Sequence, residues 1–226
     1  MGLPLLFALP PGALRIGLVE AEDVHVETSR PEYLRLIADE VKSRIDPAYV
    51  YPDPLQKGIR SLLKTYGFHP SGRNRPASEF LVKDIQMRGE FNPINVIVDI
   101  NNHLSLISHL PISILDLDKT GEKLCARVGM ENESYVFNRE GQELSLKHLL
   151  VIARSEGDLQ AVGSPVKDSQ ATKVFESTKR VVGVVYTTPG LSPDDEFKPF
   201  LERFCELLRS QAGASRASWQ ILDQTC

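Results

Sequence analysis

The sequence lacks the features that mark membrane, disulfide-rich and disordered proteins. No stretch of its 226 residues approaches the roughly 18 consecutive apolar residues that a membrane-spanning helix requires. The three cysteines, Cys125, Cys205 and Cys226, are odd in number and far apart, which fits neither a disulfide framework nor a zinc site. With 42% hydrophobic and 25% charged residues, the composition is typical of a soluble globular protein, which we expect in the cytoplasm.

The sequence also lacks the common catalytic and cofactor motifs. It contains no G-x-S-x-G nucleophile elbow, no H-E-x-x-H metal site, no P-loop and no Rossmann glycine fingerprint. These absences leave no sequence signal for a strong nucleophile or for nucleotide-driven chemistry. No metal or organic cofactor is implied.

Basic residues are a minority overall but are concentrated in one region. The chain has 26 Lys and Arg against 30 Asp and Glu, a net charge of −4. Between Lys57 and Arg88, seven basic residues stand against two acidic ones, which leaves the rest of the chain at about −9. A cationic segment on an acidic body suits contact with backbone phosphate. Two amphipathic helices with solvated faces would give the same pattern.

Prolines predict where five helices begin, because proline lacks the N–H that the first helical turn leaves unpaired. These prolines are Pro31, Pro54, Pro76, Pro93 and Pro193. Ser29, in a capping box with Glu32, is expected to cap the first helix. Asp53 and Ser192 are expected to cap the second and the last.

Strand-like runs lie between the predicted helices. They cover residues 14–26, 123–128, 134–137, 149–154, 159–162 and 181–187, with a short tail strand at 219–222 after a linker at 210–218. Helices and strands alternate without a regular βαβα rhythm, which favours the α+β class. We expect one domain over residues 1–226.

The segment from Pro93 to Lys119 is the most informative part of the chain. Its apolar side chains recur at helical spacing, at Ile97, Ile100, Leu104 and Ile107. Asn95, Asp99 and Asn102 fall on another face of the same turns. A solvated helix face would explain this pattern, and so would a row of polar side chains along a cavity.

This segment resembles the editing, or tRNA-binding, domain of the phenylalanyl-tRNA synthetase beta subunit (the B3/B4 domain) and its free-standing relatives. That family has the pattern P-I-N-x-V-V-D-x-x-N, then a proline and D-x-D-K. The corresponding residues here are Pro93-Ile94-Asn95, Val98-Asp99, Asn102, Pro111 and Asp116-Leu117-Asp118-Lys119. Upstream, residues 75–79 (Arg-Pro-Ala-Ser-Glu) resemble the R-P-S-S-E start of the preceding helix in the free-standing members. The matching region covers about 57–188, with 1–56 and 189–226 as variable extensions.

The resemblance implies mixed, mostly antiparallel sheets with about five helices packed against them. It also implies a tRNA partner and hydrolysis of an amino acid from the 3′ end of a mischarged tRNA. Such an ester is already reactive, so the protein need only seat the aminoacyl group, orient a water and stabilise the oxyanion. Aminoacylation is not implied, because the catalytic core of an ATP-using synthetase is missing. A non-catalytic tRNA- or RNA-binding module and an amino-acid or small-molecule binding protein remain alternatives.

The candidate catalytic residues are Asn95, Asp99, Asn102, Ser113 and Asp168. Ser113 stands where the synthetase domain has a histidine that contributes to the editing pocket. Asp168 is the candidate to replace the glutamate of the family's glycine-rich loop, which recognises a tyrosine hydroxyl. Because both positions are altered, specificity for tyrosine does not carry over. For Asp99, capping a nearby loop is an equally good interpretation.

The candidate substrate or RNA contacts are Arg60, Arg73, Arg75, Ser78, Glu79, Asp116 and Asp118. The arginines would hold phosphate or pair with neighbouring acids. The two aspartates would contact substrate or stabilise a turn. Histidine ordinarily titrates near neutrality, so His103 and His109 are possible general bases, although a lone histidine beside an apolar helix is more often a surface or core residue.

Overall fold

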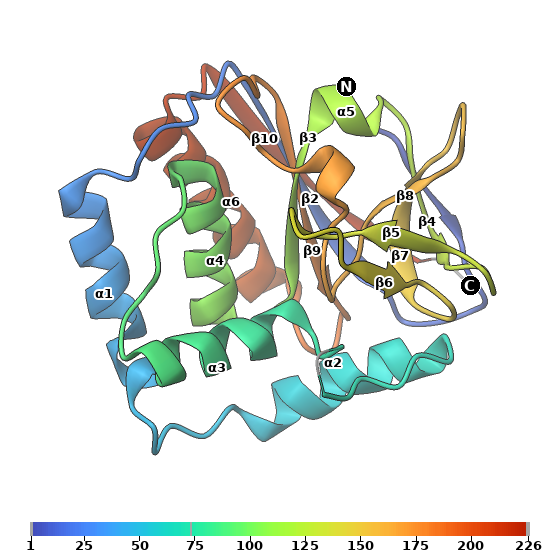
Figure 1. Ribbon diagram of the computed structural model, residues 1–226, viewed down its shortest axis with the longest axis horizontal. Coiled ribbons are helices and arrows are strands. Elements are labelled where there is room, and N and C mark those ends of the chain that lie inside the picture. Colours follow the sequence, from blue (N-terminus) through green and yellow to red (C-terminus); the bar gives the residue numbers. More distant parts are fainter. Residues whose placement is uncertain (1, 73, 225–226) are drawn as a thin grey trace.

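The computed structural model describes residues 2–72 and 74–224, and a four-stranded antiparallel sheet forms its centre (Figure 1). The strand order is β10-β2-β9-β3, so β3 lies at an edge. The strands are β2 (Arg15–Glu22), β3 (Ile112–Asp116), β9 (Val181–Thr187) and β10 (Arg216–Asp223). Helices cover one face of this sheet, and a second sheet covers the other.

The second sheet has the order β1-β4-β7-β8, and a hairpin formed by β5 and β6 lies beside it. Its strands and those of the hairpin are β1 (Leu5–Ala8), β4 (Leu124–Val128), β5 (Ser134–Val136), β6 (Glu143–Ser145), β7 (Leu150–Arg154) and β8 (Ala161–Gly163). The β1–β4 pair is parallel, and the β4–β7, β7–β8 and β5–β6 pairs are antiparallel. These sheets confirm the α+β class with mixed, mostly antiparallel pairing.

Strand β9 shows how the two sides are joined. Successive side chains of a strand point to opposite faces. Val181 and Val185 belong to the helix-side core, whereas Val182, Val184 and Tyr186 belong to the core between the two sheets. Because both faces are covered, this strand is a continuous apolar run, and its predicted range, 181–187, is confirmed.

The long helices are α1 (Pro31–Ile45), α2 (Asp53–Thr65), α3 (Ala77–Arg88), α4 (Val96–Ser108) and α6 (Asp194–Ala212). Figure 1 shows α4 and α6 beside the central sheet, α1 outside α4, and α2 and α3 along one end of the layers. Helix α6 approaches the sheet at Gly17 and Gly183. A Cβ at Gly17 would lie 2.6 Å from Leu201 Cδ2, and one at Gly183 would lie 2.8 Å from Phe204 Cε1. The close packing of α6 therefore depends on these glycines.

Four of the five prolines lie at helix starts, whereas α4 begins three residues after Pro93, and the three predicted caps are wrong. Helix α1 is preceded by Arg30, and Ser29 instead donates a hydrogen bond to Asp99. Asp53 is the first residue of α2 rather than its cap. Ser192 does not cap α6, because its hydroxyl lies 2.8 Å from that of Thr187. Tertiary partners compete for these side chains, and a local pattern does not show them.

The end of α6 and the start of β10 also differ from the prediction. Helix α6 continues to Ala212 and β10 begins at Arg216, so the predicted linker at 210–218 is reduced to a short turn. Gly213 makes this turn with a φ of 67°. Strand β10 is long because it pairs with β2 over eight positions, polar ones included. A short helix, α5 (Leu117–Thr120), stands where a turn was expected.

No helix among the described residues is long and apolar enough to cross a membrane.

Candidate functional site

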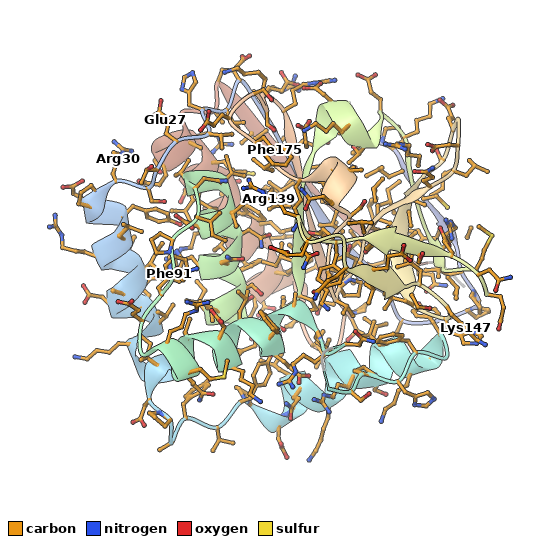
Figure 2. The ribbon with its side chains drawn as sticks, viewed as in Figure 1. Glu27, Arg30, Phe91, Arg139, Lys147 and Phe175 are labelled. Atoms are coloured by element: carbon orange, nitrogen blue, oxygen red, sulfur yellow. The ribbon has the colours of Figure 1, made fainter. Side chains whose placement is uncertain are left out.

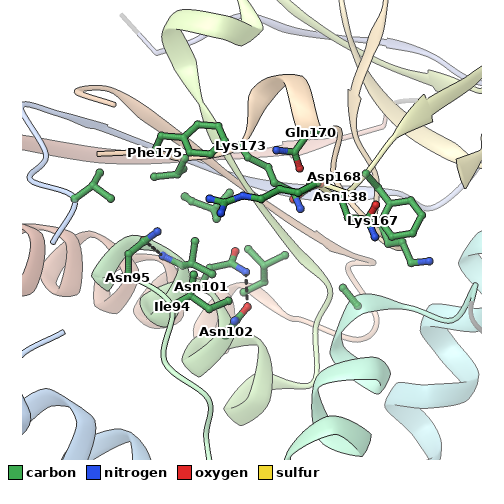
Figure 3. A pocket seen from close by; sticks show the side chains of 18 of the residues that line it. Ile94, Asn95, Asn101, Asn102, Asn138, Lys167, Asp168, Gln170, Lys173 and Phe175 are labelled. Atoms are coloured by element: carbon green, nitrogen blue, oxygen red, sulfur yellow. Dashed lines mark hydrogen bonds between the residues drawn. The ribbon is translucent and has the colours of Figure 1, made fainter. Parts of the chain in front are cut away.

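A cavity of about 1110 Å³ lies beside the edge strand β3. Its walls come from the first turns of α3 and α4, from β3, from the tip of the β5–β6 hairpin and from residues 166–177 (Figure 3). Ligand pockets are typically about 300–1,000 Å³. This cavity is therefore large enough for a small-molecule ligand.

The cavity combines an apolar wall with many polar groups. The apolar and aromatic lining includes Phe80, Val98, Ile112, Ile114, Phe137, Val166, Val174 and Phe175. The amide lining comprises Asn95, Asn101, Asn102, Asn138 and Gln170. The charged lining comprises Glu27, Arg75, Arg139, Glu140, Lys167, Asp168, Lys173 and Glu176. Such a lining suits a ligand with an apolar part and several hydrogen-bonding groups.

Asp168 is the most perturbed acid in this lining. Its Oδ1 accepts hydrogen bonds from Ser113 Oγ at 2.6 Å and from the Ser164 backbone N–H at 3.3 Å. Ser113 Oγ also lies 3.0 Å from the hydroxyl of Tyr186 on β9. Burial raises the pKa of the Asp168 carboxyl to about 7, although the bonds from Ser113 and Ser164 and the ammonium of Lys173 lower it. The carboxyl therefore changes its protonation state near neutral pH.

The backbone around Asp168 is shaped to admit its carboxylate. A Cβ at Gly163 would lie 2.9 Å from Asp168 Oδ1 and 3.3 Å from Ser113 Oγ. A larger residue at this position would displace the carboxylate. The buried hydroxyl of Tyr135 donates to Ser164 Oγ at 3.1 Å and so fixes the loop that follows β8. Ser113 itself is fully buried and supports Asp168 without lining the cavity.

The first turns of α4 bring three asparagines to the cavity. Asn95 caps the helix, because its Oδ1 accepts from the Val98 backbone N–H at 3.0 Å. The helix thus begins at Val96, three residues after the predicted start at Pro93. Asn102 Oδ1 accepts from Asn101 Nδ2 at 3.3 Å. Asn101 was not predicted as a site residue. Its position directly before Asn102 was the available signal.

Asp99 does not line the cavity, and its side chain serves the fold. The residue is fully buried. Its Oδ1 accepts from the Ile94 backbone N–H at 2.8 Å, and its Oδ2 accepts from Ser29 Oγ at 2.6 Å. Burial raises the pKa of Asp99, and these two bonds lower it. The Asp99 carboxylate joins α4 to two neighbouring segments, as the alternative interpretation of the sequence proposed. Asp99 is therefore not a residue of the candidate site.

The acidic turn after β3 is also separate from the cavity lining. Asp116 caps α5 by accepting from the Asp118 backbone N–H at 3.1 Å, and its Oδ2 lies 2.7 Å from both Lys119 Nζ and Thr178 Oγ1. Asp118 pairs with Arg180 at 2.7 Å. The prediction that this turn contacts substrate is therefore not supported by its placement. These aspartates stabilise the end of β3.

Three predicted contacts on α2 and α3 bond to other protein groups and do not line the cavity. Arg60 forms a bidentate salt bridge with Glu79, with N–O distances of 2.7 and 2.6 Å. Glu79 is only 6% exposed. Ser78 is fully buried and accepts from the Tyr51 hydroxyl at 3.0 Å. Arg60 and Glu79 therefore hold these two helices together, and Ser78 joins α3 to the segment before α2.

Arg75 is the predicted basic contact that does line the cavity. Its Nε donates to the Gly72 carbonyl at 2.8 Å. Arg73 lies outside the described residues. Three further cations of the lining, Arg139, Lys167 and Lys173, were not proposed as site residues, because they stand in loops without helical or strand periodicity.

The two histidines proposed as general bases do not line the cavity. His103 is fully buried, with its Nε2 2.8 Å from Glu40 Oε2 and its Nδ1 3.1 Å from the Tyr33 hydroxyl. His109 Nε2 lies 2.6 Å from the Tyr49 hydroxyl, and burial lowers its pKa to about 4. Both histidines therefore belong to the core between helices. Among the described residues, no three His, Cys, Asp or Glu side chains are grouped as a metal site.

Much of the cavity lining lies in the part of the chain that matches a known protein family. The family model for the B3/4 domain matches residues 70–192, just over half of the chain. A phenylalanine–tRNA ligase beta subunit from Bartonella henselae is 34% identical over 91 residues, which make up 40% of this chain and 11% of that protein. The crystal structure of an N-terminal fragment of the phenylalanyl-tRNA synthetase beta subunit from Pyrococcus horikoshii aligns with 96% of this chain and 50% of that fragment, with 12% identity and a TM-score of 0.42. Helix α4, β3 and residues 166–177 all lie within the region that the family model matches.

Proposed function

Because the chain belongs to the B3/4 domain family, we propose that it hydrolyses the ester bond of a mischarged aminoacyl-tRNA, acting in trans on the 3′ end. The resemblance to the editing domain of the synthetase beta subunit supports this reaction class. The cavity beside β3 supports the place where it occurs. The products are a free amino acid and a tRNA with an intact 3′ end.

The observation that carries the proposal is the Asp168 carboxyl in the cavity lining, with a pKa raised to about 7. A general base works best when its pKa is close to the working pH, because it is then both ionised and basic enough to take a proton. Ser113 holds one carboxylate oxygen at 2.6 Å and so fixes the direction of the group. Asp168 is thus equipped to orient and deprotonate a water.

The reaction is a simple acyl transfer to water. The water oxygen attacks the ester carbonyl carbon while Asp168 takes one of the water's protons. The resulting tetrahedral oxyanion collapses, the bond to the ribose oxygen breaks, and that oxygen receives the proton from Asp168. The carboxylate is regenerated, so no other reactant is needed. The amide of Asn102 is the donor in the lining that would stabilise the oxyanion.

The remaining lining supports the two ends of such a substrate. Ile112, Ile114 and Val174 supply an apolar wall for an amino-acid side chain. Arg139, on the hairpin tip, is placed for backbone phosphate. Its guanidinium carbon lies 5.9 Å from the centre of the Phe175 ring, and Figure 2 shows the two residues side by side. Arginine is suited to phosphate because its planar group binds two oxygens at once.

A screen of mischarged tRNAs tests this function. The purified chain is incubated with a panel of tRNAs, each carrying a defined non-cognate amino acid, and release of the amino acid is followed in single turnover. We expect release from at least one member, and an Asn102→Ala variant that is slower by about 10-fold or more because it loses an oxyanion donor. Arg88→Met, on the far end of α3, is the control and should act at the wild-type rate. Silence across the whole panel would remove the enzymatic proposal.

One observation favours a second function, binding without hydrolysis. Where the synthetase domain has a histidine, this chain has Ser113, whose hydroxyl is already bonded to Asp168. The pocket would then retain a tRNA end or an amino acid without cleaving it. Calorimetric binding of an aminoacylated tRNA, with no amino acid released during the experiment, would select this function.

A further inference from the structure

Two hydroxyls and a carboxyl form a hydrogen-bonded chain that runs from the core between the two sheets to the cavity. Tyr186 is fully buried, and its hydroxyl lies 3.0 Å from Ser113 Oγ. Ser113 is also fully buried, and its Oγ lies 2.6 Å from Asp168 Oδ1. Of these three residues, only Asp168 lines the cavity. The chain therefore links a buried phenol to the candidate base.

The pairing of β3 with β9 places Tyr186 beside Ser113. Ser113 lies opposite Val184 in the antiparallel register. Tyr186 is two residues beyond Val184, so its side chain points to the same face of the sheet as that of Ser113. A diagonal cross-strand neighbour of this kind is within reach of an aromatic side chain. The contact between the two hydroxyls is thus fixed by the register of two strands.

The directions of these hydrogen bonds follow from a count of donors. A serine hydroxyl has one hydrogen to donate and two lone pairs that accept. The neighbours of Ser113 Oγ are the Asp168 carboxyl at 2.6 Å, the Tyr186 hydroxyl at 3.0 Å and the Ser164 carbonyl at 3.3 Å. An ionised carboxylate and a carbonyl only accept, and the carboxylate forms the shorter and stronger bond. Ser113 therefore gives its hydrogen to ionised Asp168, and Tyr186 donates to Ser113.

Tyr186 is suited to be a constant donor in this chain. Burial raises the pKa of its hydroxyl, so the phenol keeps its proton while Asp168 titrates. Without that donor, Ser113 Oγ would lose a partner, and the Ser164 carbonyl would compete with Asp168 for the serine hydrogen. A hydrogen bond donated to a hydroxyl also strengthens the bond that this hydroxyl donates. Tyr186 thus strengthens the hold of Ser113 on the carboxylate.

We propose that Tyr186 is a positioning residue whose hydroxyl directs the Ser113 hydroxyl to the Asp168 carboxylate. This inference rests on the proposed function, in which Asp168 is the base. Loss of the phenol hydroxyl weakens a bond to the ionised carboxylate, so the pKa of Asp168 should rise. The other groups that act on Asp168, or on its charged neighbour, are the Ile114 and Ser164 N–H groups, Lys173, Arg139, Glu140 and Tyr135. A Tyr186→Phe variant leaves all of them in place.

Titration of the Asp168 carboxyl carbon by NMR tests the chain without any substrate. The carbon-13 resonance is followed from pH 5.5 to 9 in the wild type and in Tyr186→Phe, which keeps the ring and removes only the hydroxyl. We expect the midpoint of the variant to lie about 0.5 to 1 pH unit higher, the effect of one weakened hydrogen bond. An unchanged midpoint would overturn the inference. Tyr33→Phe is the control, because it removes a buried hydroxyl that lies 3.1 Å from His103 Nδ1, and it should leave the midpoint in place.

A double-mutant cycle shows whether Tyr186 acts through Ser113. In Ser113→Ala the chain is already broken, so adding Tyr186→Phe should shift the midpoint no further. The same shift in both backgrounds would show that Tyr186 acts by another route and would overturn the inference. If Tyr186→Phe does not fold, the Cζ resonance of Tyr186 decides. It should follow the Asp168 midpoint in the wild type and lose most of this response in Ser113→Ala, whereas an equal response in both chains would overturn the inference.

The outcomes separate this inference from the proposed function. The expected midpoints in a chain that deacylates no tRNA would support the hydrogen-bonded chain and remove the enzyme. Deacylation with the same pH profile in the wild type and in Tyr186→Phe would support the enzyme and remove the positioning role.

Discussion

At the scale of single residues, the behaviour of Asp168 depends on residues from three strands. Ser113 comes from β3, Tyr186 from β9, and Gly163 from β8. Only Asp168 and Ser113 could be proposed from the sequence, and only because the resemblance aligned them with family positions. The pKa of about 7 could not be predicted, because it arises from burial that the fold creates.

Ser113→Ala should move the pH dependence of deacylation to higher pH. The Ser113 hydroxyl donates to the Asp168 carboxylate and lowers its pKa, so its removal raises the pKa above 7. Less of the base is ionised at pH 7, and the rate there should fall several-fold. The rate should recover at higher pH. The measurement is the single-turnover rate from pH 5.5 to 9.

Ser105→Ala is the matched control for this variant. Ser105 is equally buried and donates to the Leu110 carbonyl at 2.7 Å, outside the cavity lining. Its removal should leave the midpoint of the pH profile unchanged. A Ser113→Ala profile identical to that of the wild type would show that Asp168 is not the group that titrates.

At the scale of elements, helix α4 separates into a structural and a functional side that its sequence does not distinguish. Asp99 and Asn102 are three residues apart, and a polar stripe through both was the natural interpretation. In the structure Asn101 and Asn102 line the cavity, while Asp99 turns to Ser29 and Ile94. Polarity indicates that a side chain needs partners, but it does not indicate whether the fold or a ligand supplies them.

Asp99→Ala should destabilise the protein. It leaves the buried Ser29 hydroxyl and the partly buried Ile94 N–H without their acceptor, at a cost of about 2–4 kcal/mol. The midpoint of thermal unfolding should fall by roughly 5–15 °C for a chain of this length. Asn102→Ala, at a partly exposed position, should change the midpoint by less than about 3 °C and still slow deacylation. Equal midpoints for the two variants would contradict the structural role of Asp99.

The strands that the sequence did not predict are short and are held by pairing with another strand. Strand β1 was missed because it pairs with β4, as Leu5 with Leu124, and no local pattern records such a partner. Strand β6 has three residues and depends on the β5–β6 hairpin. Strand β9, in contrast, was predicted at its observed bounds because burial on both faces leaves a continuous apolar run in the sequence.

At the scale of the whole molecule, three of the seven cations in the segment predicted from composition are neutralised by ion pairs. Ion pairs join Lys57 to Asp53, Arg60 to Glu79 and Arg88 to Asp84. The cations of the cavity lining are Arg75, Arg139, Lys167 and Lys173. We assign Arg75, Arg139 and Lys173 to the RNA. An RNA end would therefore be held by few phosphate contacts.

Binding of tRNA should accordingly depend only weakly on salt. Three phosphate contacts give a slope of log K against log salt of about −2 to −3. Lys173→Met should reduce the slope by about 1, whereas Arg88→Met should leave it unchanged. Fluorescence anisotropy with labelled tRNA at several salt concentrations measures these slopes. A slope steeper than about −5, or an effect of Arg88→Met equal to that of Lys173→Met, would contradict the assignment of the RNA contacts to the cavity.

The single-turnover rate of deacylation as a function of pH, in the wild type and in Asp168→Asn, tests the central claim most directly. A base with a pKa of about 7 predicts a wild-type rate that rises with pH and levels off above a midpoint near 7. The Asp168→Asn variant should be about 10²- to 10⁴-fold slower and should lose that midpoint. An Asp168→Asn variant that keeps the wild-type rate and profile would contradict the claim that this carboxylate drives the reaction.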